Sequence, residues 1–181
     1  MDKRIDIIVI DNDLEALALR SALEWWGVKV NMHFIGKAQD IVDIFKKENL
    51  APYICFAAHG NEINERWGFQ LIELGEEIAK KQPYDKILFP SDISEFVKLQ
   101  NNHVLSNACV TGNKEMADAF LKNGAESYIG PKSAPFANAS LYFALNFYYW
   151  LFAKEKSVKE AFEKSMTMID KEIDEFVLFE K

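Results

Sequence analysis

The chain has 181 residues, a net charge of −7 and a hydrophobic content of 49%. This composition supplies enough apolar side chains for a substantial core and excludes a disordered chain. The acidic balance argues against nucleic acid as a main partner, because binding to phosphates requires clustered Lys and Arg. A chain of this length forms one compact domain by default, so we expect a single domain over residues 1–181.

The compartment is indicated by the start of the chain and by its cysteines. The first residues lead directly into a strand-like segment, without an apolar leader or a cleavage site. The two cysteines, Cys55 and Cys109, are too few for a disulfide framework, so we expect free thiols and a cytoplasmic protein. The most apolar segment, residues 136–153, contains three polar residues and precedes a strongly polar stretch. It therefore predicts a buried core helix, and no membrane association is expected.

The first third of the chain alternates between strand-like and helix-like patterns. Residues 5–10 are a β-branched run broken only by Asp6, which is typical of a strand buried on both faces. Apolar residues then recur at helical spacing over 14–26, and Gly27 ends that helix. The same reasoning predicts a strand at 28–34, a helix at 38–47 and a strand at 53–58.

The remaining chain departs from simple alternation at one place. Two short strand-like pieces at 69–74 and 86–89, separated by a polar linker at 75–85, predict a hairpin. The later elements are a helix capped by 90–92 and running to about 99, a strand at 103–108, a helix at 113–122, a strand at 126–129, helices at 137–153 and 158–169, and an edge strand at 176–179. Such a pattern indicates an α/β sheet with helices on both faces, with its site beyond the carboxyl ends of the strands.

Two of these strand endings carry the candidate chemistry. His59 closes the predicted strand at 53–58, the third core strand, and Cys109 closes the one at 103–108, the fourth core strand. Neighbouring strands lie ~4.8 Å apart, so both side chains would emerge at one edge of the sheet. An imidazole there can take the thiol proton, and the thiolate is a nucleophile. Gly60 allows close backbone approach, so its N–H is a candidate oxyanion donor.

Other chemistry is not indicated by the sequence. There is no phosphate-binding glycine loop, and the three histidines lack metal-ligand spacing, so no cofactor and no metal are expected. The alternative interpretation of the two strand endings is structural: Cys109 as a small core residue and His59 as a turn residue. From spacing alone, both interpretations stay open.

A family resemblance bears on this choice. Residues 54–60, Ile-Cys-Phe-Ala-Ala-His-Gly, resemble the apolar strand and His-Gly motif of caspase-like peptidases. Residues 103–112, His-Val-Leu-Ser-Asn-Ala-Cys-Val-Thr-Gly, resemble the Leu-Ser-Ala-Cys-x-Thr-Gly motif of CHAT domains, a group related to caspases, separase and gingipain. Asn107 departs from that pattern. The separation of His59 and Cys109 is also the one typical of caspases, and the resemblance extends from residue 54 to the last predicted strand.

The resemblance implies a caspase-like α/β fold: a three-layer sandwich with a mostly parallel six-stranded sheet, helices on both faces and an antiparallel edge strand. It implies a cysteine-type endopeptidase in which Cys109 attacks the scissile carbonyl and His59 serves as general base and then acid. The oxyanion would lie between the N–H groups of Gly60 and Cys109, and a thioester would be hydrolysed. The expected partners are a peptide or protein substrate and an activating partner protein or self-association.

The resemblance also implies a specificity pocket, lined by residues after the first strand and after the fifth. The candidates are Asp11, Asp13 and Lys132. A desolvated carboxylate in this pocket would favour Arg or Lys before the cut, because it forms bidentate hydrogen bonds, whereas an inward-pointing Lys132 would reverse the preference. Alternatively Asp11 and Asp13 only cap the helix that follows, and we expect at least one of them to do so.

Two further hypotheses remain. The acidic residues after the first strand resemble the start of a receiver domain, but His59 stands where such a domain needs a phospho-accepting Asp. The other hypothesis is a catalytically silent caspase-like scaffold that keeps the dyad.

Overall fold

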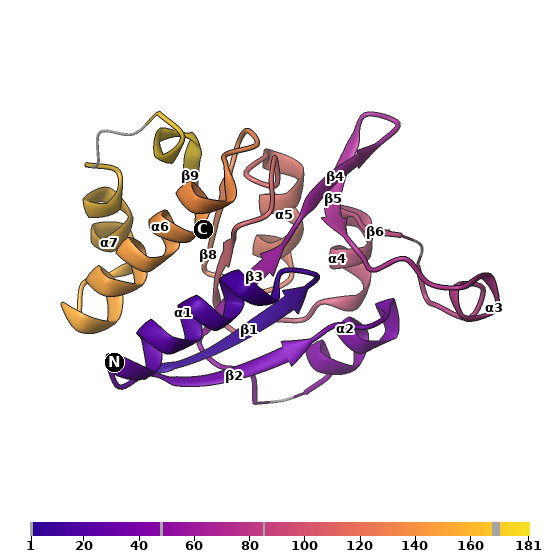
Figure 1. The fold of residues 1–181 in the computed structure, drawn as a ribbon, viewed down its shortest axis with the longest axis horizontal. Coiled ribbons are helices and arrows are strands. Elements are labelled where there is room, and N and C mark those ends of the chain that lie inside the picture. The colour runs from indigo at the N-terminus through magenta and orange to yellow at the C-terminus, as the bar shows by residue number, and fades with distance from the viewer. Residues whose placement is uncertain (1, 48, 85, 168–170) are drawn as a thin grey trace.

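The computed structural model describes residues 2–47, 49–84, 86–167 and 171–181. Its centre is a six-stranded sheet in the order β2-β1-β3-β7-β8-β9 (Figure 1). The strands are β1 (Arg4–Ile10), β2 (Lys29–Phe34), β3 (Tyr53–Ala58), β7 (His103–Ser106), β8 (Ser127–Pro131) and β9 (Phe176–Glu180). All neighbouring pairs are parallel except β8 and β9. The predicted mostly parallel sheet with an antiparallel edge strand is confirmed.

Helices cover both faces of this sheet (Figure 1). One face packs against α2 (Ala38–Phe45), α4 (Pro90–Phe96) and α5 (Lys114–Lys122). The other packs against α1 (Asp13–Trp25), α6 (Ala137–Tyr148) and α7 (Val158–Ser165). Phe56 stacks on Phe45 and Phe69 in the first layer, and Phe143 stacks on Phe176 in the second. Burial of these aromatic rings accounts for a large part of the stabilisation of both layers.

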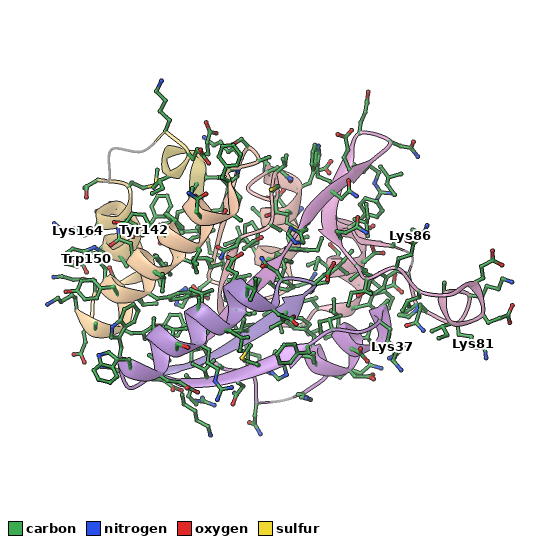
Figure 2. All side chains as sticks on the ribbon, viewed as in Figure 1. Lys37, Lys81, Lys86, Tyr142, Trp150 and Lys164 are labelled. Carbon is green, nitrogen blue, oxygen red and sulfur yellow. The ribbon has the colours of Figure 1, made fainter. Side chains whose placement is uncertain are left out.

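The long predicted helix over 137–153 is divided in the structure. After α6, the backbone continues as a π-helical turn, η1 (Tyr149–Ala153). Figure 2 shows Trp150 of this turn beside Lys164 of α7, whose ammonium lies 5.8 Å from the ring centre. Among the described residues, no helix combines the length and the apolar character required to span a bilayer. The predicted helix over 158–169 ends at Ser165, and residues 168–170 lie outside the described part of the chain.

A buried carboxylate fixes the edge strand β2. Asp6 of β1 is 2% exposed and accepts hydrogen bonds from Asn31 and the backbone N–H of Ala51, at 2.9 and 2.6 Å. His33 of β2 lies 3.0 Å from the same carboxylate. Burial raises the pKa of Asp6, but these hydrogen bonds outweigh it and hold the pKa below its usual value. The polar break in the first strand is therefore structural.

The segment between His59 and Cys109 forms a second, antiparallel sheet. Its strands are β4 (Gly60–Ile63), β5 (Arg66–Gln70) and β6 (Ile87–Leu88), and α3 (Glu76–Ala79) lies between the last two. The sequence prediction missed β4, because its residues are polar and exposed, and wrongly extended β5 to residue 74. Figure 1 shows β4 and β5 reaching beyond the end of β3. The Gln70 N–H donates to the His59 carbonyl at 2.8 Å, so this sheet is attached directly at His59.

Candidate active site

The pairing of β3 with β7 sets the relation between His59 and Cys109. The two strands are parallel neighbours, and each residue of β3 pairs with the residue fifty positions later, from Tyr53 with His103 to Phe56 with Ser106. Continued past the strand ends, this register places His59 opposite Cys109. The prediction that the third and fourth strands are adjacent is confirmed, and both residues follow the carboxyl ends of their strands.

The backbone next to His59 touches the backbone of Cys109. A Cβ atom placed on Gly60 would lie 1.9 Å from the carbonyl oxygen of Cys109 and 2.9 Å from its nitrogen, so only glycine fits. Burial raises the pKa of the half-buried Cys109 thiol, while the backbone N–H groups of Cys109 and Gly60 act in the opposite direction. These are the two N–H groups that the family resemblance implies as oxyanion donors.

Side chains within the Cys109 loop brace it from inside the core. Ser106 and Thr111 are fully buried, and their hydroxyl oxygens lie 2.7 Å apart. Thr111 donates to the Ala108 carbonyl at 2.7 Å, and the Ala108 N–H donates to Ser106 Oγ at 3.1 Å. Tyr128 of β8 donates to the Thr111 carbonyl at 3.1 Å. These bonds explain why Ser and Thr stand at their positions around the cysteine.

The residue after the cysteine is conformationally strained. Val110 has φ 58°, in the left-handed region that a β-branched residue rarely adopts. It is held there because its N–H donates to the Ser133 carbonyl at 2.8 Å and its carbonyl accepts from Asn113 Nδ2 at 2.8 Å. Strain of this kind is maintained by its surroundings and concentrates at functional sites. Here it forms the sharp turn that follows Cys109.

A buried carboxylate, missed in the sequence analysis, lies near His59 and Cys109. Glu15 of α1 accepts hydrogen bonds from Asn107 Nδ2 and, at 2.5 Å, from Asn12 Nδ2. Burial raises the pKa of Glu15, and these two amides and the nearby charge of His59 counteract it. Glu15 shares the buried face of α1 with Leu19 and Leu23. An acidic residue on the apolar face of a helix is a signal that the sequence does contain.

The contacts of Asn107 explain why an asparagine occupies this position. Its side chain is buried and donates to Glu15, and its N–H donates to the Phe56 carbonyl at 3.0 Å. Its Oδ1 has no hydrogen-bond partner. The residue that departs from the CHAT pattern thus connects the Cys109 loop to α1.

The predicted pocket residues lie at the same edge of the sheet, with their side chains exposed. Asp11 follows β1 with φ 52°, Asp13 begins α1, and Lys132 follows β8. The expectation that Asp11 or Asp13 caps α1 is wrong: Asn12 occupies the N-cap position and makes no side-chain capping bond. The Asn12 amide bonds Glu15 instead. Asp13 still lies in the first turn, where its charge suits the helix dipole.

The other histidines have structural partners away from this site. His33 contacts Asp6, and His103 Nδ1 lies 2.9 Å from Ser127 Oγ. Cys55 is fully buried in β3, as predicted. Within the described ranges, no group of three or more His, Cys, Asp or Glu side chains is placed to hold a metal ion.

Solved structures provide the comparison for this arrangement. The chain is similar to an Arg-specific cysteine proteinase, gingipain R, with a TM-score of 0.66 and 13% identity over 99% of this chain and 47% of that one. The fold is caspase-like. The pro- and mature domain complex of Porphyromonas gingivalis RgpB gives a TM-score of 0.63, with 13% identity over 100% of this chain and 47% of that one. The separase of the Saccharomyces cerevisiae separase–securin complex gives 0.60 and 11%, over 99% of this chain and 12% of that one.

No family model and no curated protein matches the sequence. The chain spans about half the length of the gingipain chains and a small part of the separase chain. Its caspase-like sheet carries His59 and Cys109 after two adjacent parallel strands, with Glu15 buried beneath them.

Proposed function

We propose that the chain is a single-domain, CHAT-type cysteine endopeptidase with His59 and Cys109 as its dyad. The observation that carries the proposal is the meeting of the two strand endings: the β3–β7 register places His59 opposite Cys109, and Gly60 packs against the Cys109 backbone. A cysteine and a histidine within reach of each other, with two N–H groups beside the sulfur, form the minimal machinery for acyl transfer.

The reaction follows from these groups. His59 takes the thiol proton as Cys109 Sγ bonds to the scissile carbonyl carbon, and the N–H groups of Gly60 and Cys109 bind the resulting oxyanion. His59 then gives its proton to the leaving amine, the C–N bond breaks, and a thioester remains. Water attacks the thioester after giving a proton to His59, the C–S bond breaks, and the thiol recovers its proton.

The resting site favours a neutral thiol. The pKa of Cys109 is raised above its usual value mainly by burial, and the charge of Glu15 adds to this. His59 must therefore remove the proton during the attack. The imidazolium formed in that step is stabilised by the Glu15 carboxylate, which acts as a positioning group held by Asn12 and Asn107.

In this proposal, the exposed residues at the same edge of the sheet determine the substrate specificity. We propose that Asp11, with Asp13 as a second candidate, favours a basic residue before the cut, a preference that an inward-pointing Lys132 would reverse. A panel of fluorogenic peptides that differ only at this position tests the assignment on wild type and Asp11→Asn. Equal rates for Arg and Asp peptides, or an unchanged preference in Asp11→Asn, would remove Asp11 from the pocket.

Regulation and location extend the proposal. We propose a cytoplasmic enzyme whose activity is set by a partner protein or by self-association. Two of the similar structures are complexes, one of the RgpB pro- and mature domains and one of separase with securin. Control by a bound protein would be consistent with a half-buried cysteine whose thiol is neutral at rest.

The decisive experiment compares wild type with Cys109→Ala, His59→Ala and the double variant in peptide hydrolysis. We expect each single variant to lose activity and the double variant to be little worse, because residues that act as one unit lose activity together. Circular dichroism and thermal unfolding check that the fold is retained. Near-normal turnover in Cys109→Ala would refute the peptidase, and inactivity of folded wild type under every activator tried would favour the silent scaffold.

A further inference from the structure

Three lysines line two adjoining hollows in the surface, between the segments that follow α2 and α4. The larger hollow has a volume of 380 Å³ and the smaller one 100 Å³. Lys47, Lys98 and Gln100 line both hollows, and Lys46 lines the larger one. Because they share three residues, the two hollows form one concave surface, which we call the lysine hollow. Its size is in the range of pockets for small ligands.

Positive charge predominates in the lysine hollow, although the chain as a whole carries a net charge of −7. Among the described residues that line it, three are lysines and one, Glu95, is acidic. The ammonium groups of Lys46, Lys47 and Lys98 make no ion pair or hydrogen bond with any described residue. Their charges are therefore available to an anion that enters the hollow.

The ends of two helices offer a simpler explanation for these lysines. Lys46 is the C-cap residue of α2, and Lys98 follows Val97, the C-cap residue of α4. A cation at such a position is favoured by the helix dipole. That effect acts on each helix separately and is limited to its last turn. It does not account for lysines from two helices that line the same hollow.

The two segments that carry the lysines are tied to each other by a buried side chain. Asn102 is 4% exposed, and its Nδ2 donates to the Ala51 carbonyl at 2.7 Å. Its Oδ1 accepts from the Gln100 N–H at 2.7 Å, and the Asn101 N–H donates to the Gly124 carbonyl at 2.9 Å. The backbone of the hollow is thus formed before a ligand arrives, which lowers the entropy cost of binding.

We infer that the lysine hollow binds a small molecule that carries two or more phosphate groups. A lysine ammonium is a compact charge with several donors and is a common phosphate ligand. Each terminal phosphate group carries a charge of about −2 at neutral pH, so linked phosphates can engage three ammonium groups at once. A single carboxylate could satisfy only part of this charge. Apolar side chains in the larger hollow can contact the rest of the molecule: Val42, Phe45 and Phe96.

The position of the lysine hollow separates it from the candidate active site. Leu50 and Asn102 line its smaller part and lie just before β3 and β7, respectively. His59 and Cys109 follow the opposite ends of the same two strands. Binding of a phosphate compound here therefore does not depend on the proposed peptidase activity, and it can be tested without any measurement of turnover.

The experiment measures binding of tripolyphosphate, ATP and citrate by isothermal titration calorimetry at low ionic strength. It compares wild type with Lys47→Gln/Lys98→Gln and with the control Lys81→Gln/Lys159→Gln. Lys81 and Lys159 are exposed and have no ion-pair partner among the described residues, so the two double variants lose the same charge. Thermal unfolding without ligand checks that each variant is folded.

We expect wild type and the control to bind tripolyphosphate or ATP at least about tenfold more tightly than citrate. Lys47→Gln/Lys98→Gln should weaken this binding by at least about tenfold, because each lost ammonium removes a charged hydrogen bond. Added salt should weaken binding to wild type. A preference for ATP would show that the apolar side chains contact the organic part, and equal binding would show that the phosphate chain suffices; either result supports the inference.

Three results would overturn the inference. One is the absence of saturable binding of either phosphate compound to wild type. Another is equal binding of citrate and the phosphates, or equal weakening in the two double variants, since either would mean that only overall charge matters. The third is tighter binding of a hexaglutamate peptide than of both phosphates, which would assign the lysines to an acidic partner protein.

Discussion

Replacing Gly60 with alanine tests whether the contact between the His59 and Cys109 segments positions the dyad. The φ of Gly60 lies outside the left-handed region, so an alanine meets no conformational barrier there and the effect is purely steric. Its Cβ would lie 1.9 Å from the Cys109 oxygen. Because ordinary contacts begin near 3.4 Å, the two segments would have to separate by about 1.5 Å.

A displacement of this size predicts two measurable effects. Misplacing catalytic groups by about 1 Å costs about 100-fold in rate, so we expect kcat/KM to fall by at least this factor. Forcing a methyl group into a closed contact costs about 2 kcal/mol, which lowers Tm by about 4–8 °C in a protein of this size. The rate of Cys109 alkylation should change as well, because the Gly60 N–H moves away from the sulfur.

The matched control is Gly75→Ala, which places its methyl group in open space at φ −61°. It should leave activity unchanged and change stability little, because the gain from restricting the unfolded chain is opposed by the loss of a favourable N-cap residue of α3. Peptide hydrolysis and thermal unfolding of both variants complete the comparison. Wild-type kcat/KM in Gly60→Ala, or an equal loss in Gly75→Ala, would refute the idea that this contact sets the dyad.

Three further predictions concern the groups around the cysteine. Glu15→Gln should lower kcat/KM roughly thirtyfold, the equivalent of losing a charge interaction of about 2 kcal/mol. The pKa of Glu15 is raised in the folded state, so the ionised carboxylate destabilises that state. Glu15→Gln should therefore gain stability relative to wild type as the pH rises through this pKa. A gain confined to acidic pH would contradict this prediction. Iodoacetamide should label Cys109 in the folded protein at a rate that still rises at pH values above the usual thiol pKa. Cys55, whose pKa is raised to about 12 by burial, should stay unlabelled. Equal labelling of the two cysteines in mass spectra would be contrary evidence. Val110→Gly should raise the free energy of unfolding, measured by urea titration, by about 1 kcal/mol, because it relieves the backbone strain at φ 58°. It should also lower turnover, because the loop after Cys109 becomes looser. Lower stability of the variant would show that no strain is stored at this residue.

The sheet could be predicted because its strands have patterns that only buried strands show. β3 lies at the predicted residues 53–58, and β1 differs from its prediction by one residue. β3 is a continuous apolar run, β1 is one broken only by Asp6, and each is followed by a polar residue, which is typical of parallel strands covered on two faces. His59 could be proposed because it follows such a run, and Cys109 because it follows the strand-like segment 103–108 and lies in a stretch that resembles the Leu-Ser-Ala-Cys-x-Thr-Gly motif.

Other features depend on contacts that a linear pattern does not contain. The sequence Gly-Asn-Glu-Ile of β4 resembles a loop, and it becomes a strand only because β5 lies beside it. The polar run 11–13 was expected to offer N-cap side chains, but the bond that Asn12 makes to Glu15 instead depends on how far α1 is rotated. Glu15 itself was predictable, because the residue four positions later, Leu19, marks the buried face of α1.

The attachment of the Cys109 loop to the strand end of β8 has a consequence for synthesis of the protein. Val110 is bound by Ser133, and Gly112 is bound by Pro131, with a Cβ on Gly112 excluded by the Gly130 carbonyl at 2.2 Å. A nascent chain that ends before residue 131 carries both His59 and Cys109 but lacks the two partners that hold the turn after Cys109. His59 and Cys109 are therefore synthesised well before the segment that holds the turn after Cys109, and a chain terminated ahead of that segment would lack this turn.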